Sequence, residues 1–284
     1  MGAGASLCLA RGMDLPCRVF VCRDGLYTEP MSDWDATQYH RLSGPQLAWG
    51  LRVLDRLQPA SGERILDVGC GTGRLTAGIL ARAPRARVTA IDRSWTMLVE
   101  AHRRFSAGPR FVQADGAALP FQGGFDVVFS TATFHWVSDH PRLFSEIHRV
   151  LARGGRLVSQ AGGGPNLARL YERTASLARQ PELAPYFEGW TDPWNFAGVD
   201  ETIGRLERAG FSKTSVWLES TPTVFPDAAS YSDFVTTVCL RHQLDRLPEE
   251  QRGGYVARLA GMAAGDEPPF TLDYWRLNID ARKL

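Results

Sequence analysis

The sequence has little lysine, no excess of charge of either sign and no paired cysteine motif. Lysine occurs only at Lys213 and Lys283, and the 32 basic residues nearly balance the 31 acidic ones, for a formal net charge of +1. Without a basic excess, the composition gives no support for a nucleic-acid partner. The cysteines include no Cys-x-x-Cys pair, which argues against structural zinc and suits a reducing compartment. There are five, at Cys8, Cys17, Cys22, Cys70 and Cys239.

The sequence also lacks an apolar run that approaches the roughly 18 residues of a membrane-spanning helix. Hydrophobic residues make up 44% and charged residues 22% of its 284 positions, an ordinary balance for a globular protein. We expect a soluble, cytoplasmic protein without a membrane partner. The first thirty residues combine small side chains with three of the five cysteines and show no sustained period. We expect residues 1–30 to be disordered or extraneous, and one domain to span residues 31–284.

A glycine-rich turn follows an apolar run in the first third of the chain. The stretch 64–68 is typical of a buried strand, and glycines follow at Gly69, Gly71 and Gly73. Glycines at such a turn allow positive φ angles and close approach of a ligand to the backbone. A dinucleotide fingerprint would need glycine or alanine at position 74, which is Arg74. A phosphate-binding P-loop would need a Lys-Ser/Thr pair, which is missing.

Strand-like and helix-like segments alternate along the first 160 residues and again near the end of the chain. Alternation at these lengths predicts a parallel sheet with helices on both faces. The expected strands are 64–68, 87–91, 110–113, 125–130, 155–160, 213–219 and 272–282, and the expected helices are 44–58, 74–83, 95–105, 141–152, 200–209, 228–246 and 248–263.

Two segments interrupt this alternation, at about 162–198 and 222–270. The first is rich in aromatic residues and proline, and the second contains the two helices expected near 228–246 and 248–263. We expect both insertions to build a small helical cap. The predicted fold class is therefore α/β and Rossmann-like, with a seven-stranded mostly parallel sheet, helices on both faces and this cap.

Acidic residues stand where the second and third strands end. Asp92, followed by Arg93, lies at the distance from the glycine turn expected of an acid that accepts hydrogen bonds from ribose hydroxyls. Its alternative role is to cap the next helix, although Ser94 is available for that. Asp115 and Gly116 follow the third strand, where an acid accepts the amine of adenine and a backbone N–H meets a ring nitrogen. The alternative for this pair is a simple turn.

The segment after the fourth strand, from Thr131 through His135, is expected to face a bound ligand. Ligands in open α/β sheets bind beyond the carboxyl ends of the strands. Together with the glycine turn, the two acids and the helix and Gly-Gly turn that follow, this ordered set resembles class I S-adenosylmethionine (SAM) methyltransferases. The aromatic pair Trp34 and Tyr39, the phrase 134–137 and the two insertions are similar to the trans-aconitate methyltransferase-like subgroup of small-molecule enzymes.

The resemblance implies SAM as the cofactor and a role for each matching position. Asp67 and the three glycines would surround the methionine moiety, Asp92 would hold the ribose and Asp115 the adenine, and Tyr39 would close over the site. One position departs from that family's pattern: His135 stands where glutamine is usual. The family's substrate therefore does not transfer to this chain.

Several motifs of other methyltransferase classes are missing, which argues against further classes of methyl acceptor. No Asn/Asp-Pro-Pro-Tyr/Phe follows the fourth strand, which disfavours methylation of base amines, and the paired glutamates of arginine methylases are missing. No Asp-Asn pair offers a catechol-type magnesium site, so we expect no metal. The acceptor is expected to be a small molecule.

The chemistry of the methyl acceptor decides whether a base is needed. A carboxylate nucleophile needs none, whereas a phenol or an acidic carbon does, and His135 is the best candidate for that base. Its alternative is to pack beside the cofactor or to donate one hydrogen bond. An acidic substrate would be bound by an arginine, with Arg169, Arg241 and Arg276 as candidates. Trp190, Trp194 and Phe196 are expected either to line the acceptor site or to form the core of the cap.

These criteria favour SAM-dependent O-methylation of a carboxylate on a small organic molecule. C-methylation with His135 as base is the alternative within the same class. A non-catalytic SAM-binding regulatory protein and a nicotinamide-dependent oxidoreductase are alternatives from other classes, and Arg74 argues against the latter.

Overall fold

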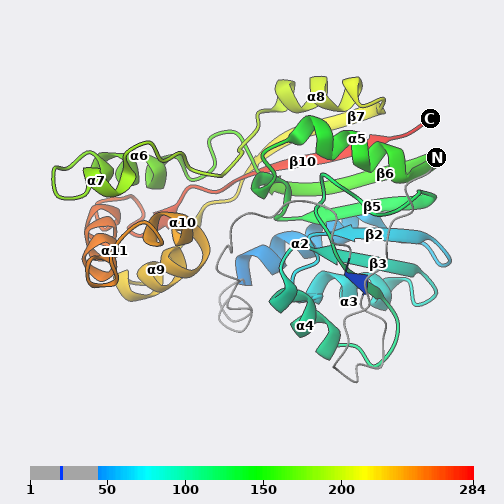
Figure 1. Ribbon diagram of the computed structural model, residues 1–284, viewed down its shortest axis with the longest axis horizontal. Coiled ribbons are helices and arrows are strands. Elements are labelled where there is room, and N and C mark those ends of the chain that lie inside the picture. The colour runs from blue at the N-terminus through cyan, green and yellow to red at the C-terminus, as the bar shows by residue number, and fades with distance from the viewer. Residues whose placement is uncertain (1–19, 22–43) are drawn as a thin grey trace.

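An eight-stranded sheet forms the centre of the computed structural model, which describes residues 20–21 and 44–284 (Figure 1). The strand order is β1-β4-β3-β2-β5-β6-β10-β7. Neighbours are parallel, except that β10 runs antiparallel to both β6 and β7. The strands of this sheet are β1 (Phe20–Val21), β2 (Arg64–Val68), β3 (Arg87–Asp92), β4 (Arg110–Gln113), β5 (Phe125–Thr131), β6 (Leu151–Gly162), β7 (Ser212–Ser220) and β10 (Trp275–Arg282).

Helices cover both faces of this sheet. On one face, α2 and α3 bury Leu54 and Ile79 against Ile65 of β2. On the other face, α5 buries Ile147 against Leu66, the next residue of β2. Successive residues of a strand point to opposite faces, so a strand buried on both sides is apolar without alternation. The helices along this part of the chain are α2 (Gly44–Leu57), α3 (Arg74–Arg82), α4 (Trp95–Arg103), the 3₁₀ helix η1 (Phe134–Trp136), α5 (His140–Val150) and α8 (Val199–Arg208).

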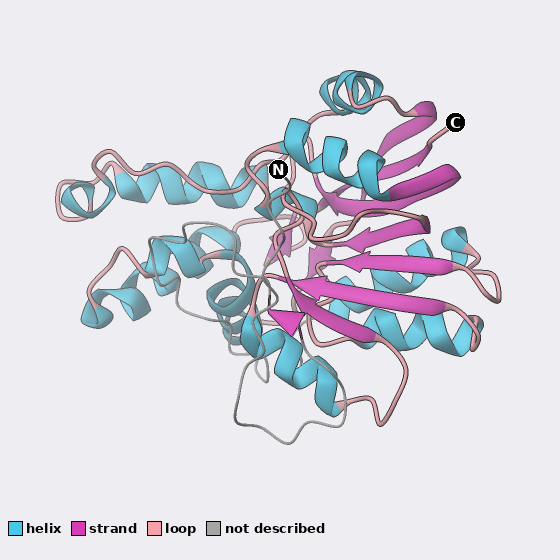
Figure 2. Cartoon of the chain, turned by 45° about the vertical axis from the view of Figure 1, so that its right-hand side comes forward, coloured by secondary structure: helices cyan, strands magenta, loops and turns pink. Residues whose placement is uncertain are grey.

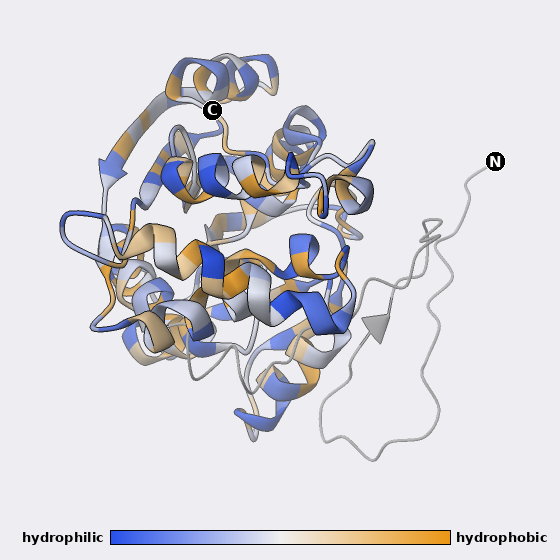
Figure 3. Ribbon diagram, turned by 90° about the vertical axis from the view of Figure 1, so that its left-hand side faces the viewer, coloured by the Kyte–Doolittle hydropathy of each residue, from blue (hydrophilic) through white to orange (hydrophobic). Residues whose placement is uncertain are grey.

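The remaining helices gather beside the sheet as a cap with its own hydrophobic core (Figure 1). That core includes Leu170, Tyr231 and Leu259, all of which are buried. Hydrophobic and hydrophilic stretches alternate along these helices, as expected where one side packs inward (Figure 3). The cap consists of α6 (Ala168–Ala178), α7 (Ala184–Phe187), α9 (Ala228–Phe234), the π-helix η2 (Val235–Cys239), α10 (Arg241–Leu244) and α11 (Glu249–Ala263), with β8 (Thr223–Val224) paired to β9 (Thr271–Leu272).

The predicted fold class is confirmed, since the seven expected strands form one mostly parallel sheet with helices on both faces and a helical cap. The short edge strand β1 was not predicted; it pairs in parallel with β4. Apart from Phe20–Val21, the expectation for residues 1–30 lies outside the described residues. The arrowheads of the parallel strands point toward the side on which the cap helices lie (Figure 2). The cap thus stands beside the sheet edge where a ligand is expected.

The larger differences from the predicted element boundaries lie at three places. The helix expected over 228–246 is broken into α9, η2 and α10, because the amide of Leu240 donates to the carbonyl of Val235 at 2.8 Å, five residues earlier. The helix expected to reach 152 ends at Val150, since Leu151 is already extended and begins β6. The last strand divides into β9 and β10.

Candidate functional site

The glycine turn after β2 depends on backbone angles that other residues adopt only with strain. Gly69, Gly71 and Gly73 have φ angles of +74°, +53° and +75°. A Cβ on Gly69 would collide with the side chain of Thr133, so two chain segments meet closely there. A Cβ on Gly71 would meet nothing within 4 Å among the described residues, so none of them fills the space above the turn. The turn therefore exposes its backbone on one side of a space of the kind that binds ligands, which we call the cradle.

Asp92 is fixed beside this cradle at the end of β3. Its Oδ2 accepts a hydrogen bond from the amide of Gly71 at 2.8 Å, and its Oδ1 accepts one from the amide of Ser94 at 2.9 Å. Ser94 itself caps α4 through the amide of Met97. The alternative role of helix cap thus belongs to Ser94, and the Asp92 carboxylate joins the glycine turn to the start of α4.

Asp67 lies beneath the turn, deep in the sheet. It is only 2% exposed, and its Oδ2 accepts a hydrogen bond from the hydroxyl of Thr76 at 2.6 Å. Burial, opposed by this hydrogen bond and reinforced by the charge of Asp92, raises the pKa of Asp67 from 3.8 to about 7. Near neutral pH this carboxyl is poised between its two protonation states.

Asp115 and Gly116 lie next to Asp92, because β3 and β4 pair with Asp92 opposite Gln113. The side chain of Gln113 donates to the carbonyl of Arg93 at 3.0 Å, which links the ends of both strands. The Oδ1 of Asp115 accepts from the amide of Ala117 at 2.8 Å. The turn-forming role considered for Asp115 is therefore present, at a location that also suits the adenine role.

β5 ends at Thr131 with an abrupt change of direction. The next residue, Ala132, has a φ angle of +53°, and its amide donates to the carbonyl of Gln160 at 2.8 Å. The hydroxyl of Thr133 donates to the carbonyl of Thr131 at 2.9 Å. Strained backbone held by such contacts is frequent at functional sites.

His135 follows in η1 and is 7% exposed. Its Nδ1 accepts a hydrogen bond from the amide of Gly162, at the end of β6, at 3.1 Å. Since an amide can only donate, the proton of the neutral ring resides on Nε2. Burial, together with the positive charges of Arg276 and His140, holds the pKa of His135 well below its ordinary value. The ring is thus neutral at physiological pH and presents Nε2–H as a donor.

Arg276 lies across β6 from His135, since it pairs with Gly162 in the β10–β6 register. The side chain is 3% exposed, and Nη2 donates to Oδ1 of Asn166 at 3.2 Å. Its guanidinium carbon lies 4.2 Å from the ring centroid of Trp49 and 4.7 Å from that of Tyr274. Aromatic faces stabilise a buried cation in this way.

His135 and Arg276 line one cavity of about 30 Å³ between the sheet edge and the cap. The predicted wall residues Trp194 and Phe196 line it as well, whereas Trp190 packs on Phe187 within the cap. The other lining residues are Gln46, Ala132, Trp136, Asn166, Leu167, Val238, Cys239 and Tyr274.

Comparison with known proteins supports a methyltransferase. A family model described as "Methyltransferase domain" matches residues 66–159. Trans-aconitate 2-methyltransferase of Methylobacterium nodulans is 30% identical over 274 residues, which cover 89% of this chain and 99% of that protein. The enzyme of the same name from Acidovorax ebreus is 35% identical over 234 residues, covering 80% and 87% respectively.

The chain belongs to the class I SAM-dependent methyltransferases. Its fold agrees: a putative methyltransferase from Bacillus halodurans superposes with a TM-score of 0.59 at 17% identity, over 83% of this chain and 99% of that one. A phosphoethanolamine N-methyltransferase from Haemonchus contortus gives 0.57 at 18% identity, over 88% of this chain and 57% of that one. The predicted family, enzyme class and cofactor SAM are thereby confirmed.

The chemistry of the cradle suits SAM. An anchored carboxylate matches paired ribose hydroxyls, and a glycine turn without side chains leaves room for the methionine part of the molecule. Within the part of the chain that is described, no group of His, Cys, Asp or Glu is arranged to hold a metal ion. Among the same residues, no helix is long and apolar enough to cross a membrane. Tyr39 lies outside the described residues.

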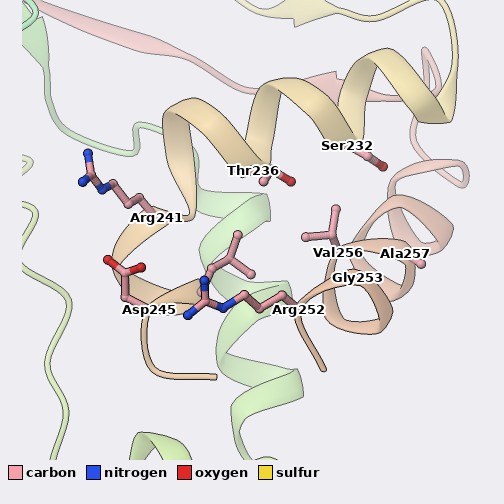
Figure 4. A pocket seen from close by; sticks show the side chains of 9 residues that line it. Ser232, Thr236, Arg241, Asp245, Arg252, Gly253, Val256 and Ala257 are labelled. Carbon is pink, nitrogen blue, oxygen red and sulfur yellow. The ribbon is translucent and has the colours of Figure 1, made fainter. Parts of the chain in front are cut away.

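The methyltransferase has a larger cavity of about 450 Å³ within the cap, apart from His135 (Figure 4). Arg241, one of the three predicted clamp arginines, lines that cavity together with Asp245 and Arg252. Arg169, the second candidate, forms ion pairs with Asp266 and Asp273 at 3.2 and 3.8 Å. Of the three candidates, Arg276 is the one that the fold brings to His135.

Asn166 and Gln46 are site residues that sequence reasoning missed. Asn166 is 3% exposed, and its Oδ1 accepts from both the amide of Trp275 and the guanidinium of Arg276. It follows the turn Gly162–Pro165 in a segment without periodicity. Such a role arises from tertiary contacts, for which the local sequence carries no signal.

Proposed function

We propose that this methyltransferase transfers the methyl group of SAM to a carboxylate oxygen of a small organic acid and so forms a methyl ester. The observation that carries the proposal is the pairing of Arg276 with His135 around the end of β6. A buried guanidinium and a fixed Nε2–H donor suit a carboxylate, because arginine binds it with two parallel hydrogen bonds and a neutral imidazole adds a third.

The residues that would hold the cofactor are those that the family resemblance implies, and they lie at the strand ends. Asp67 and the turn of Gly69, Gly71 and Gly73 would surround the methionine moiety, and Asp92 would bind the ribose hydroxyls. Two observations support these roles: no described residue fills the space above Gly71, and the amide of Gly71 donates a hydrogen bond that holds the Asp92 carboxylate beside it.

The adenine would be held by the neighbouring strand end. Asp115 and Gly116 lie beside Asp92 through the pairing of β3 with β4, and Arg93 precedes the helix between those strands. Thr131 would face the methyl donor from the end of β5. Tyr39 keeps its predicted role of closing the site from the N-terminal side.

Bound SAM supplies an electrophilic methyl group on its sulfonium. The protein then needs to hold the acceptor oxygen in line and to exclude water. Arg276 would bind and orient the carboxylate, and His135 would donate from Nε2 to one of its oxygens. No proton has to be removed, because the carboxylate is already ionised at neutral pH.

The state of His135 bears on the alternative, C-methylation with His135 as base. A base needs a vacant lone pair, but Nδ1 is already bonded to the amide of Gly162 and Nε2 carries the proton. The low pKa of His135 also makes its protonated form unfavourable. Carboxylate methylation requires neither a vacant lone pair on His135 nor its protonated form.

The test uses methyl-labelled SAM, a panel of small organic acids and the purified protein. We expect label in a product that releases methanol on mild base treatment, as a methyl ester does. Arg276→Gln should lower kcat/KM about 100-fold or more, since a buried charge-assisted contact contributes several kcal/mol. Arg258→Gln, on the exposed side of α11 beside Glu182, is the matched control and should retain activity. A base-stable product would refute the proposal.

A further inference from the structure

Few charged side chains are found among the described residues that line the cavity next to His135 and Arg276. Among the described residues that line it, Arg276 carries the only charged side chain, because His135 is neutral at physiological pH. The polar partners that accompany it, Asn166 and Gln46, are amides. Among the described residues, this set matches one carboxylate, and none of its members offers a countercharge for a second or third.

Other arginines near the base of the cap are already neutralised. Arg173 bonds Asp266 through both terminal nitrogens, and Arg169 pairs with Asp266 and Asp273. Asp266 is buried in this arrangement, with a side-chain exposure of 6%. Recruiting either arginine to a substrate would remove one of the two cations that balance the buried carboxylate of Asp266, which is unfavourable.

Aromatic rings that contact one another form one wall of the cavity that Arg276 also lines. The ring centroids of Trp136 and Trp194 are 3.6 Å apart, and Phe196 lies nearly parallel to Trp194 at 5.6 Å with an interplanar angle of 20°. His135 also stacks on Trp194, at 5.0 Å and 24°. An aromatic wall of this kind offers a face on which a planar apolar group can stack. The cavity measures about 30 Å³, so Trp194 has to be displaced before such a group can enter.

Trp194 has a further property that points to a ligand. Its indole Nε1 is buried and has no hydrogen-bond partner among the described residues. Buried donors are nearly always satisfied in folded proteins, so one that is left over in a binding cavity marks a place for a ligand acceptor or a water molecule.

From these observations we infer that the acceptor is a monocarboxylic acid with a planar, aromatic body, and not a polycarboxylate. Arg276 and His135 would bind its single carboxylate, and Trp136, Trp194 and Phe196 would enclose the ring. This inference rests on the proposed function of carboxylate methylation. It separates the chain from relatives whose name specifies trans-aconitate.

The experiment compares cinnamate, hexanoate and trans-aconitate as acceptors with labelled SAM. We expect kcat/KM for cinnamate to exceed that for trans-aconitate at least about tenfold, because extra carboxylates would be desolvated without partners. Trp194→Leu should lower kcat/KM for cinnamate about tenfold and change that for hexanoate less than about threefold, since only cinnamate has a ring to stack. Trp190→Leu, four residues away against Phe187, is the matched control and should behave as wild type.

The outcomes separate the two proposals. Preferred esterification of trans-aconitate would overturn the monocarboxylate inference while carboxylate methylation stands. Equal losses for cinnamate and hexanoate in Trp194→Leu would overturn the stacking role. If no acid is esterified although S-adenosylhomocysteine binds, the proposed function itself fails. Binding of S-adenosylhomocysteine by each variant shows that its fold is intact.

Discussion

The buried carboxyl of Asp67 makes a quantitative prediction about stability and pH. Its pKa is about 7 in the folded protein against 3.8 as the reference value, so the folded state keeps a proton that the unfolded chain has lost. This proton preference stabilises the fold fully below pH 3.8, and the stabilisation is lost as the pH rises to about 7. Each pH unit in that window changes the free energy of unfolding by about 1.4 kcal/mol.

Replacing Asp67 with asparagine removes this titration but keeps an oxygen that can accept from Thr76. The free energy of unfolding of Asp67→Asn relative to wild type should therefore rise by about 2 to 3 kcal/mol between pH 5 and pH 8 and level off above pH 7. Urea titrations of both proteins at pH 5, 6, 7 and 8 measure the difference. Any constant effect of the new amide cancels, because only the change with pH is compared. A difference that stays within about 0.5 kcal/mol across this range would refute the reasoning.

The hydrogen bond from Thr76 allows a second test, in which the direction of the pKa change of Asp67 is predicted. Its hydroxyl lowers the pKa of Asp67 against the larger effect of burial. Thr76→Val removes that hydrogen bond, so the pH at which stability levels off should move upward. A shift to lower pH would contradict the assignment of burial and hydrogen bonding as opposing causes.

Three other variants test the cofactor cradle and the neutral histidine. Asp92→Asn should weaken binding of S-adenosylhomocysteine about 10- to 150-fold by calorimetry, the loss expected for a charge-assisted hydrogen bond; unchanged affinity would argue against ribose binding. Gly69→Ala should cost about 3 kcal/mol of stability in urea titrations, from its positive φ and the collision with Thr133. At saturating SAM, kcat should be flat from pH 6.5 to 8.5, since His135 stays neutral; a rise with slope one that His135→Asn abolishes would indicate that His135 is a base. His135→Asn, which keeps an acceptor for the amide of Gly162, should preserve that flat profile with a lower kcat.

The central sheet was predictable because its signals are local. The apolar run of β2 ends at glycines that only a sharp turn requires, and β3, β4 and β5 repeat the pattern of apolar strand and polar end. Because these strands are apolar on both faces, few folds other than a parallel sheet between two layers of helices are compatible with such a sequence. The locations of Asp92 and Asp115 at neighbouring strand ends follow directly from that topology.

The cap was less predictable because its structure depends on contacts between distant segments. The π-helix η2 accommodates one extra residue between α9 and α10, and the hydrophobic periodicity of the sequence does not reveal such an insertion. Likewise, Asn166 and Gln46 reach the cavity from segments that are far apart in the sequence, so periodicity within either segment does not show that they meet.

Arg276 is the exception, and the topology of the sheet explains why. β10 is antiparallel to its neighbours, so its first residues stand at the edge where the parallel strands end. Arg276 is the second residue of β10, opposite Gly162 at the end of β6, and therefore meets His135 across a single strand. Arg169 and Arg241, on cap helices, have no such constraint. The sequence predicted this last strand but not its direction, and the antiparallel direction is what brings an arginine at its start to the edge where the parallel strands end.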